Sequence, residues 1–183
     1  MEEKFKKAIV AGVICGVILV ILSFIYTVVW RLVFVNDLNN WMNELTRQSN
    51  MAYPVFPQIT GSIIMAGFIV MILFVLGILT FFLAGVLAAQ KASAFIKNKN
   101  DAIMVGLVSG ALAEVIHRPF AMVFSFIMDL VKPITTSNSG DTTVNAFISA
   151  GTQLICTFPI ILIAGAVLAM LGALVYAAFK LNV

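Results

Sequence analysis

The sequence predicts an all-α membrane protein in which four transmembrane helices form two helical hairpins. Of the 183 residues, 62% are hydrophobic and only 10% are charged, whereas a soluble domain has about a quarter charged residues. The mean hydropathy is +1.09. Three uncharged runs, over residues 8–30, 48–90 and 142–179, each exceed the roughly 20 residues that a helix needs to cross the hydrocarbon of a bilayer.

A fourth apolar stretch, over residues 102–131, completes the set. We therefore expect a single integral membrane domain over residues 1–183. Its transmembrane segments are predicted at about 8–35, 58–90, 102–131 and 144–180, with outer loops at 36–57 and 132–143 and an inner loop at 91–101.

The basic residues predict the orientation in the membrane, because lysine and arginine remain on the cytoplasmic side. Seven lie at one end of the predicted bundle and three at the other: Lys4, Lys6, Lys7, Lys91, Lys97, Lys99 and Lys180 against Arg31, Arg47 and Lys132. We expect a multi-pass protein of the cell membrane with both termini in the cytoplasm. The inner lysines suit anionic lipid headgroups.

The first outer loop is predicted to contain a short amphipathic helix in the membrane interface. Its apolar residues recur at helical spacing and its polar residues occupy the other faces. The apolar residues are Leu38, Trp41, Met42 and Leu45. Aromatic residues gather on this side, so we expect Trp30, Trp41 and Tyr53 to anchor the chain at the interface.

An internal repeat is visible when the chain is moved by 94 residues. Residues 8–16 then match residues 102–110, and each stretch contains Gly-x-x-x-Gly, with the pairs Gly12/Gly16 and Gly106/Gly110. Residues 83–89 also resemble residues 171–177. Glycines four apart let two helices approach closely in lipid. They form either a homodimer face or, as we favour, contacts inside one chain.

A polar cluster interrupts the third segment. Glu114, His117, Arg118 and Pro119 lie near its middle, and we expect an ion pair between Glu114 and Arg118, which are four residues apart. Pro119 lacks an amide hydrogen, so we expect the helix to break there. A second proline, Pro159, is expected to interrupt segment four, and the polar residues before it, Gln153 and Thr157, are candidates to line a cavity with the cluster.

Three interpretations of this cluster compete. It is a neutral structural brace, a conduction or transport site in which Glu114 and His117 carry protons or cations, or a recognition site in which Arg118 binds an anionic ligand, a lipid headgroup or a charged partner helix.

Enzymatic chemistry is not indicated. One histidine and two cysteines do not make a zinc site or a disulfide oxidoreductase motif, and phosphate-loop and dinucleotide motifs are lacking. We therefore expect no catalytic residue, no metal and no cofactor. We also expect no nucleic acid partner, because a basic surface with aromatic platforms is lacking.

The residues from Ala84-Gly85 through the short lysine-rich loop to Asp101-Ala102 and the Gly106/Gly110 pair resemble the helix–loop–helix centre of small, uncharacterised, glycine-rich tetraspan membrane proteins of archaea and bacteria. This resemblance covers about a third of the chain and implies four helices in a prokaryotic cell membrane. We expect a non-enzymatic scaffold or accessory subunit whose partners are lipids, further copies of the chain or other membrane subunits. The alternative is a small channel or transporter for protons, ions or a small solute that uses the polar cluster.

Overall fold

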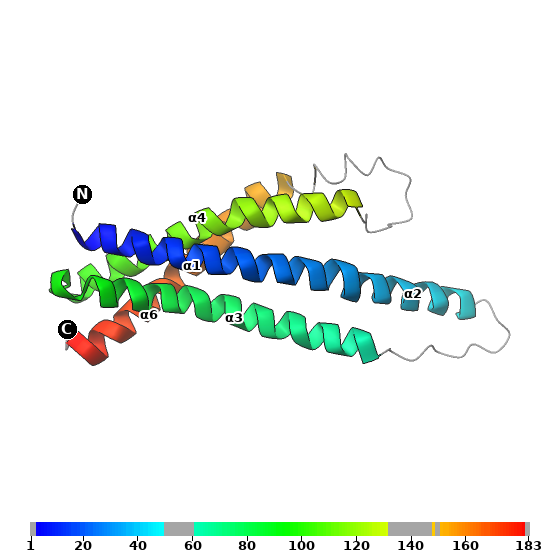
Figure 1. Ribbon diagram of the computed structural model, residues 1–183, viewed down its shortest axis with the longest axis horizontal. Helices are drawn as coiled ribbons and strands as arrows, with labels where there is room; N and C mark the ends of the chain where they lie inside the picture. Colours follow the sequence, from blue (N-terminus) through cyan, green and yellow to red (C-terminus); the bar gives the residue numbers. More distant parts are fainter. Residues whose placement is uncertain (1–2, 50–60, 132–147, 149–150, 182–183) are drawn as a thin grey trace.

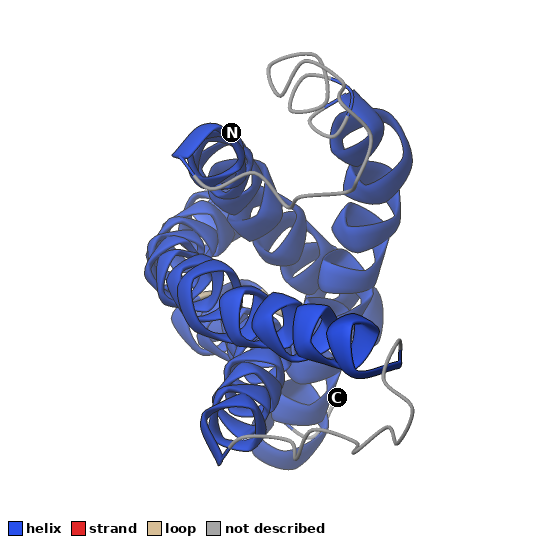
Figure 2. Cartoon of the chain, turned by 90° about the vertical axis from the view of Figure 1, so that its right-hand side faces the viewer, coloured by secondary structure: helices blue, strands red, loops and turns tan. Residues whose placement is uncertain are grey.

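The computed structural model describes residues 3–49, 61–131, 148 and 151–181. Four long helices run along one axis in alternating directions (Figure 1): α1 (Glu3–Val28), α3 (Gly61–Lys91), α4 (Lys99–Val131) and α6 (Phe158–Tyr176). Each belongs to a helical span that is long and apolar enough to cross a membrane. The view along the axis shows helices and no strand in the described part of the chain (Figure 2). The predicted all-α fold with four membrane spans is confirmed.

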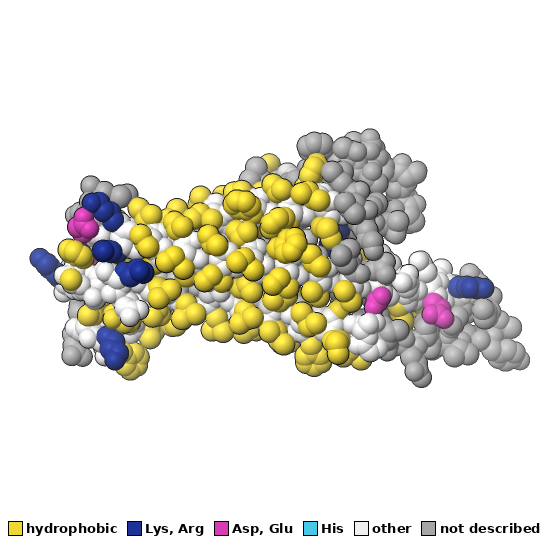
Figure 3. Space-filling view, viewed as in Figure 1, with side chains coloured by type: hydrophobic (Ala, Val, Ile, Leu, Met, Phe, Trp, Pro, Cys, Tyr) yellow, Lys and Arg dark blue, Asp and Glu magenta, His cyan; other side chains and the backbone are white. Residues whose placement is uncertain are grey.

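The surface has the character expected of a protein in lipid. Hydrophobic side chains cover the middle of the molecule, and the charged side chains lie mainly toward its two ends (Figure 3). On α3, Met65, Phe68, Met71 and Phe74 are each more than 60% exposed. Contiguous apolar surface of this kind is rare in a soluble monomer, and in a membrane the lipid tails cover it.

The first helix does not end where the predicted first segment ends. A π-helical stretch, η1 (Val29–Phe34), follows α1 and leads directly into α2 (Val35–Ser49). The predicted amphipathic helix is thus present as α2, but it continues the line of α1 instead of turning into the interface (Figure 1). At 1.5 Å per residue, the rod from Glu3 to Ser49 is about 70 Å long, whereas a bilayer with its headgroups is about 40–45 Å thick.

Helix α4 is continuous through Pro119, so the predicted break in the third segment was wrong. A proline removes one backbone hydrogen bond and crowds one carbonyl group. Inside a membrane bundle, neighbouring helices and small local adjustments compensate for that loss. The remaining hydrogen bonds of α4 then carry the helix on to Val131.

The fourth segment changes its helical form at Pro159. After the helical residues 151–152, it passes through a π-helical stretch, η3 (Gln153–Thr157), continues as α6 and ends in η4 (Ala177–Leu181). Pro159 lies near the start of α6, which continues directly from η3, so the chain is helical without interruption over residues 151–181. The expected interruption at Pro159 is present only as a change from π-helical to α-helical form just before the proline.

Small residues hold the bundle together. Helix α1 packs on α3 and α4, and α6 packs on the same two helices. Alanines fill the half of the core nearer the α3–α4 turn, with Ala8, Ala11, Ala88, Ala102 and Ala173 among the fully buried residues. Lipid tails are as apolar as leucine, so helices in a membrane associate through close van der Waals packing, and small residues allow that approach.

The predicted repeat has a counterpart in the pattern of burial. Six of the seven buried positions of α1 coincide, after a shift of 94 residues, with buried positions of α4: Ala8, Ala11, Gly12, Cys15, Gly16 and Leu19 with Ala102, Val105, Gly106, Ser109, Gly110 and Ala113. The helix contacts differ, however. Gly12 and Gly16 lie against α4, whereas Gly106 and Gly110 lie against α6. The first helices of the two hairpins thus match in their buried positions but not in the helices that they contact. Duplication as the origin of the repeat stays a prediction.

Candidate intramembrane polar site

Glu114 belongs to a row of residues, each four positions apart, on the face of α4 that packs against α6. Gly106, Gly110, Glu114 and Arg118 share this row, and residues four apart lie on one face of a helix. A Cβ atom at Gly110 would lie 2.6 Å from the carbonyl oxygen of Gly165, so the row packs directly on the backbone of α6. Glu114 is the sixteenth of the 30 residues in the span Lys99–Met128. Its carboxyl group therefore belongs to the centre of the span.

The carboxyl group of Glu114 is fully buried and is hydrogen-bonded to His117. The distance from Nδ1 of His117 to Oε2 of Glu114 is 2.9 Å, and the side chains are 15% and 0% exposed, respectively. The other carboxyl oxygen, Oε1, has no hydrogen-bond partner among the described residues. A carboxylate offers about four acceptor sites, so most of its capacity is unused.

The predicted ion pair between Glu114 and Arg118 is not formed among the described residues, and His117 takes the place of the arginine. Nε of Arg118 is buried without a hydrogen-bond partner, while the residue as a whole stays partly exposed. Full burial of a guanidinium group is costly. The smaller imidazole, three residues from Glu114, reaches the carboxylate at a lower cost in desolvation.

The charges of the cluster balance. With Glu114 ionised, His117 neutral and Arg118 protonated, the three side chains carry no net charge. In this state Nδ1 of His117 carries the hydrogen that Oε2 of Glu114 accepts. The arrangement is a hydrogen-bonded carboxyl–imidazole pair next to a guanidinium group in an otherwise apolar stretch of α4.

Among the described side chains, the predicted companions from segment four form no hydrogen bond with this cluster. Thr157 is half-buried just before α6, and its side chain does not cap that helix. Pro159 and Pro119 are exposed. The backbone of Gln153 lies in η3, and its side chain is outside the described ones.

The four predicted packing glycines lie inside the monomer. Added Cβ atoms at Gly12 and Gly16 would lie within 3.1 Å of α4, and at Gly106 and Gly110 within 2.8 Å of α6. The closest approaches, however, were not singled out from the sequence. They are at Gly85 and Gly172 between α3 and α6. Small residues at positions 84, 85, 88 and 89 were the available signal.

Two of the three predicted interfacial anchors lie in the part of the rod that follows α1. Trp30 belongs to η1 and Trp41 to α2, and both are half-buried. The ring of Trp30 stacks with that of Tyr26 at 6.1 Å. Tyr53 lies outside the described residues.

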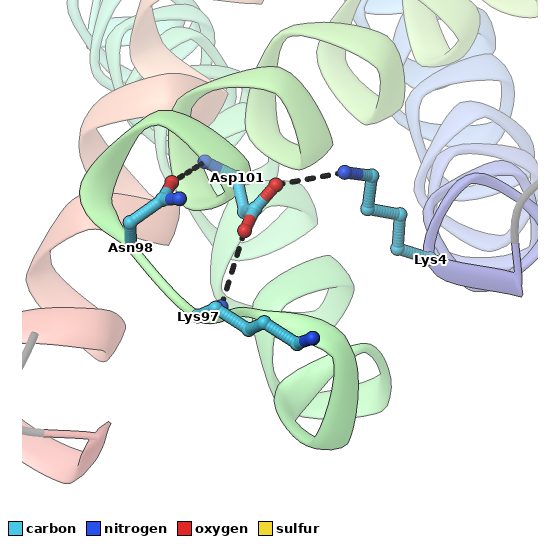
Figure 4. A network of polar contacts seen from close by, with 4 residues as sticks. All are labelled: Lys4, Lys97, Asn98 and Asp101. Carbon is cyan, nitrogen blue, oxygen red and sulfur yellow. Dashed lines mark hydrogen bonds and ion pairs between the residues drawn. The ribbon is translucent and has the colours of Figure 1, made fainter.

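A second polar network, which sequence reasoning missed, joins α1 to α4 at the end of the bundle where the chain begins (Figure 4). Oδ1 of Asp101 accepts a hydrogen bond from Nζ of Lys4 at 2.7 Å, and Oδ2 accepts one from the amide of Lys97 at 3.1 Å. The side chain of Asn98 accepts one from the amide of Asp101. The signal was the Asn98-x-x-Asp101 spacing, which is typical of a helix start.

An open cleft of about 480 Å³ lies beside this network, lined by Glu3, Lys4, Phe95, Lys97 and Asp101 among others. Two acidic and two basic side chains there offset each other in charge. In the described part of the chain no three His, Cys, Asp or Glu side chains come close enough to hold a metal ion. The polar site of α4 is therefore the stronger candidate for a function.

Comparison with known proteins identifies no relative of this chain. No protein-family model, no curated protein sequence and no solved structure matches this chain. The expectations about its function therefore depend on the residues and the geometry described above.

Proposed function

We propose that the protein is a non-enzymatic scaffold or accessory subunit of a complex in a prokaryotic cell membrane. The observation that carries this proposal is the continuous helical rod formed by α1, η1 and α2. The rod is longer than a bilayer is thick, so α2 extends beyond the hydrocarbon when α1 spans it.

Helix α2 has the surface of a docking element. It is amphipathic, with Met42 48% exposed and Trp41 and Leu45 half-buried. Its 15 residues are close to the length at which an isolated helix is marginal in water, and most helical stability in proteins comes from packing of an apolar face. A partner subunit or a second copy of the chain that covers this face would stabilise it.

The orientation proposed for the protein places α2 outside the cytoplasm. The start of α1, the turn between α3 and α4 and the end of α6 lie at one end of the bundle (Figure 1), and the lysine-rich segments belong to these places. By the distribution of lysine and arginine this end is cytoplasmic, and its lysines then face anionic headgroups. Helix α2 lies at the opposite end.

Site-specific photo-crosslinking in the native membrane tests the proposal. A photoreactive residue at Met42, on the apolar side of α2, should give a discrete adduct with a membrane subunit or a second copy. The matched control is Asn40, which is also exposed and lies on the other side of the helix. Equal labelling at both positions, together with a monodisperse monomer after mild extraction into nanodiscs, would exclude the scaffold function.

A second function is favoured by one observation, the unpartnered and fully buried oxygen of Glu114. Ionisable residues inside a membrane are costly and often mark an ion pathway. We propose as the alternative a small channel or transporter in which Glu114 carries the ion. Flux into proteoliposomes of wild type and of Glu114→Gln tests it, and equal leakage in both would exclude conduction through this residue.

A further inference from the structure

We propose that Glu114 and His117 form a proton-binding pair in the interior of the bundle. The inference goes beyond the scaffold function. It also deepens the alternative function by naming the proton as the ion, and in that respect it rests on the alternative function. Proton binding and proton flux are measured separately, so the two proposals can fail independently.

The first reason to propose a proton-binding pair is the incomplete hydrogen bonding of the Glu114 carboxyl group. Oε2 of Glu114 accepts one hydrogen bond, and Oε1 accepts none from the described residues although the side chain is 0% exposed. An ionised carboxylate in an apolar interior needs compensating hydrogen bonds. Protonation of the carboxylate removes its charge and decreases its need for hydrogen-bond donors, which makes a proton a suitable ligand.

The second reason to propose a proton-binding pair is the contact of the His117 imidazole with this carboxyl group. Nδ1 of His117 is 2.9 Å from Oε2 of Glu114, so a hydrogen can be shared directly between the two side chains. A proton that arrives forms an N–H bond at Nε2 of His117. The N–H bond at Nδ1 breaks, and its proton forms an O–H bond at Oε2 of Glu114. The imidazole stays neutral overall and has changed its tautomer, while the carboxylate has become a carboxylic acid.

Space and charge favour a proton over other ligands. One turn before Glu114, an added Cβ atom at Gly110 would lie 2.6 Å from the backbone of α6, so the helices leave little room for a hydrated ion. The charge of an ionised Glu114 opposes an anion. Only a proton forms a covalent bond with the carboxylate and adds almost no volume.

The neighbouring helices contribute few titratable groups that compete with the pair. Beyond the lysines at its start, the first span offers Cys15, Tyr26 and, at its far end, Arg31. Helix α3 has no titratable side chain before Lys91, and the fourth span offers Cys156 and Tyr176 before Lys180. On α4 itself the charged neighbour is Arg118, which stays protonated at all accessible pH values.

The single histidine of the chain makes the proposal directly measurable. Nuclear magnetic resonance of tag-free protein with ¹⁵N-labelled histidine, in lipid nanodiscs, reports the tautomer and protonation of His117 without a mutation. The titration covers roughly two pH units on either side of the ordinary pKa values of glutamate and histidine. We expect a pH-dependent change of the two ring nitrogens, with Nδ1 carrying the hydrogen in the deprotonated pair.

Two variants identify the partner of His117. Glu114→Gln should shift the midpoint of the His117 titration, whereas the control Asp101→Asn, which removes a carboxylate at the end of the bundle, should leave that midpoint unchanged. An identical His117 titration in wild type and Glu114→Gln would overturn the pair, as would a wild-type signal that does not respond to pH. If Glu114→Gln does not fold, infrared detection of a buried, pH-dependent carboxylic acid in the wild type replaces it, and the lack of that signal overturns the proposal.

Proteoliposome flux separates this proposal from the alternative function. A titrating, Glu114-dependent His117 signal without proton flux supports the pair and excludes transport. Proton flux that Glu114→Gln abolishes, together with a His117 titration that the same variant leaves unchanged, overturns the pair while transport through Glu114 stands.

Discussion

Replacing Gly85 by alanine should force α3 and α6 apart. A Cβ atom at this position would lie 1.7 Å from the carbonyl oxygen of Ala169 and 2.5 Å from its carbonyl carbon. Ordinary van der Waals contact begins at about 3.4 Å, so the helices have to separate by roughly 1.7 Å. The obstacle is backbone, and no side-chain rotation relieves it. The shift also disturbs Gly172, whose added Cβ atom would lie 2.1 Å from the carbonyl oxygen of Phe82 on the same interface.

We expect a large loss of stability from this substitution. Overpacking typically costs about 1–3 kcal/mol and occasionally more, and because backbone blocks the new methyl group we expect the free energy of unfolding to fall by about 3 kcal/mol or more. Gly77→Ala is the matched control, since it lies on the same helix and an added Cβ atom there meets nothing within 4 Å. Alanine is about 1 kcal/mol better than glycine in a helix, so this variant should be as stable as wild type or slightly more stable.

Reversible unfolding in mixed micelles, followed by circular dichroism, measures both variants. Nanodisc-embedded samples provide a check that the order of stabilities is the same in lipid. If Gly85→Ala unfolds at the same denaturant concentration as Gly77→Ala, the close contact of α3 with α6 is not present in the protein, and the reasoning from small-residue packing fails at this interface.

Three further predictions concern the ends and the centre of the bundle. Asp101→Asn should lower the free energy of unfolding only slightly, because an ion pair near the surface, here with Lys4, contributes little; a double-mutant cycle with Lys4→Ala measures the coupling between the two side chains, and a coupling energy of zero would show that the ion pair does not stabilise the fold. Ser109→Ala removes a hydrogen bond to α3 and should lower the free energy of unfolding by about 0.6 kcal/mol in the same assay. A decrease of several kcal/mol would show that Ser109 contributes more than this one hydrogen bond. In a chain without its two native cysteines, Asn43→Cys should react with a membrane-impermeant thiol reagent added outside and Asn98→Cys should not, and the reverse pattern would refute the proposed orientation.

The spans were predictable because they depend on short-range properties of the chain. Runs without charge, such as residues 8–30, have to form helices in lipid, where backbone groups find no water. The ends were less predictable. The first segment continues through η1 into α2 without a turn. The spacing of Trp41 and Leu45 predicts that these residues form a helix, but it does not predict the direction of that helix relative to α1.

The candidate site was predicted as a set of residues but not as a set of contacts. The scarcity of charges made Glu114 and Arg118 conspicuous in the third segment. Spacing alone favours the pair at four residues, but it takes no account of what burial costs each partner. His117 is the smaller group and reaches the enclosed carboxylate, while Arg118 remains partly exposed.

By itself, the sequence determined that this chain forms four apolar helices and which ends of them carry the lysines. These properties follow from composition and length, because a helix in lipid satisfies its own backbone. Only the tertiary structure decided which helix each glycine face meets, with Gly12 against α4 and Gly106 against α6. It also decided that His117 holds Glu114. Such choices depend on the distances and desolvation costs of atoms that come together only when the helices pack.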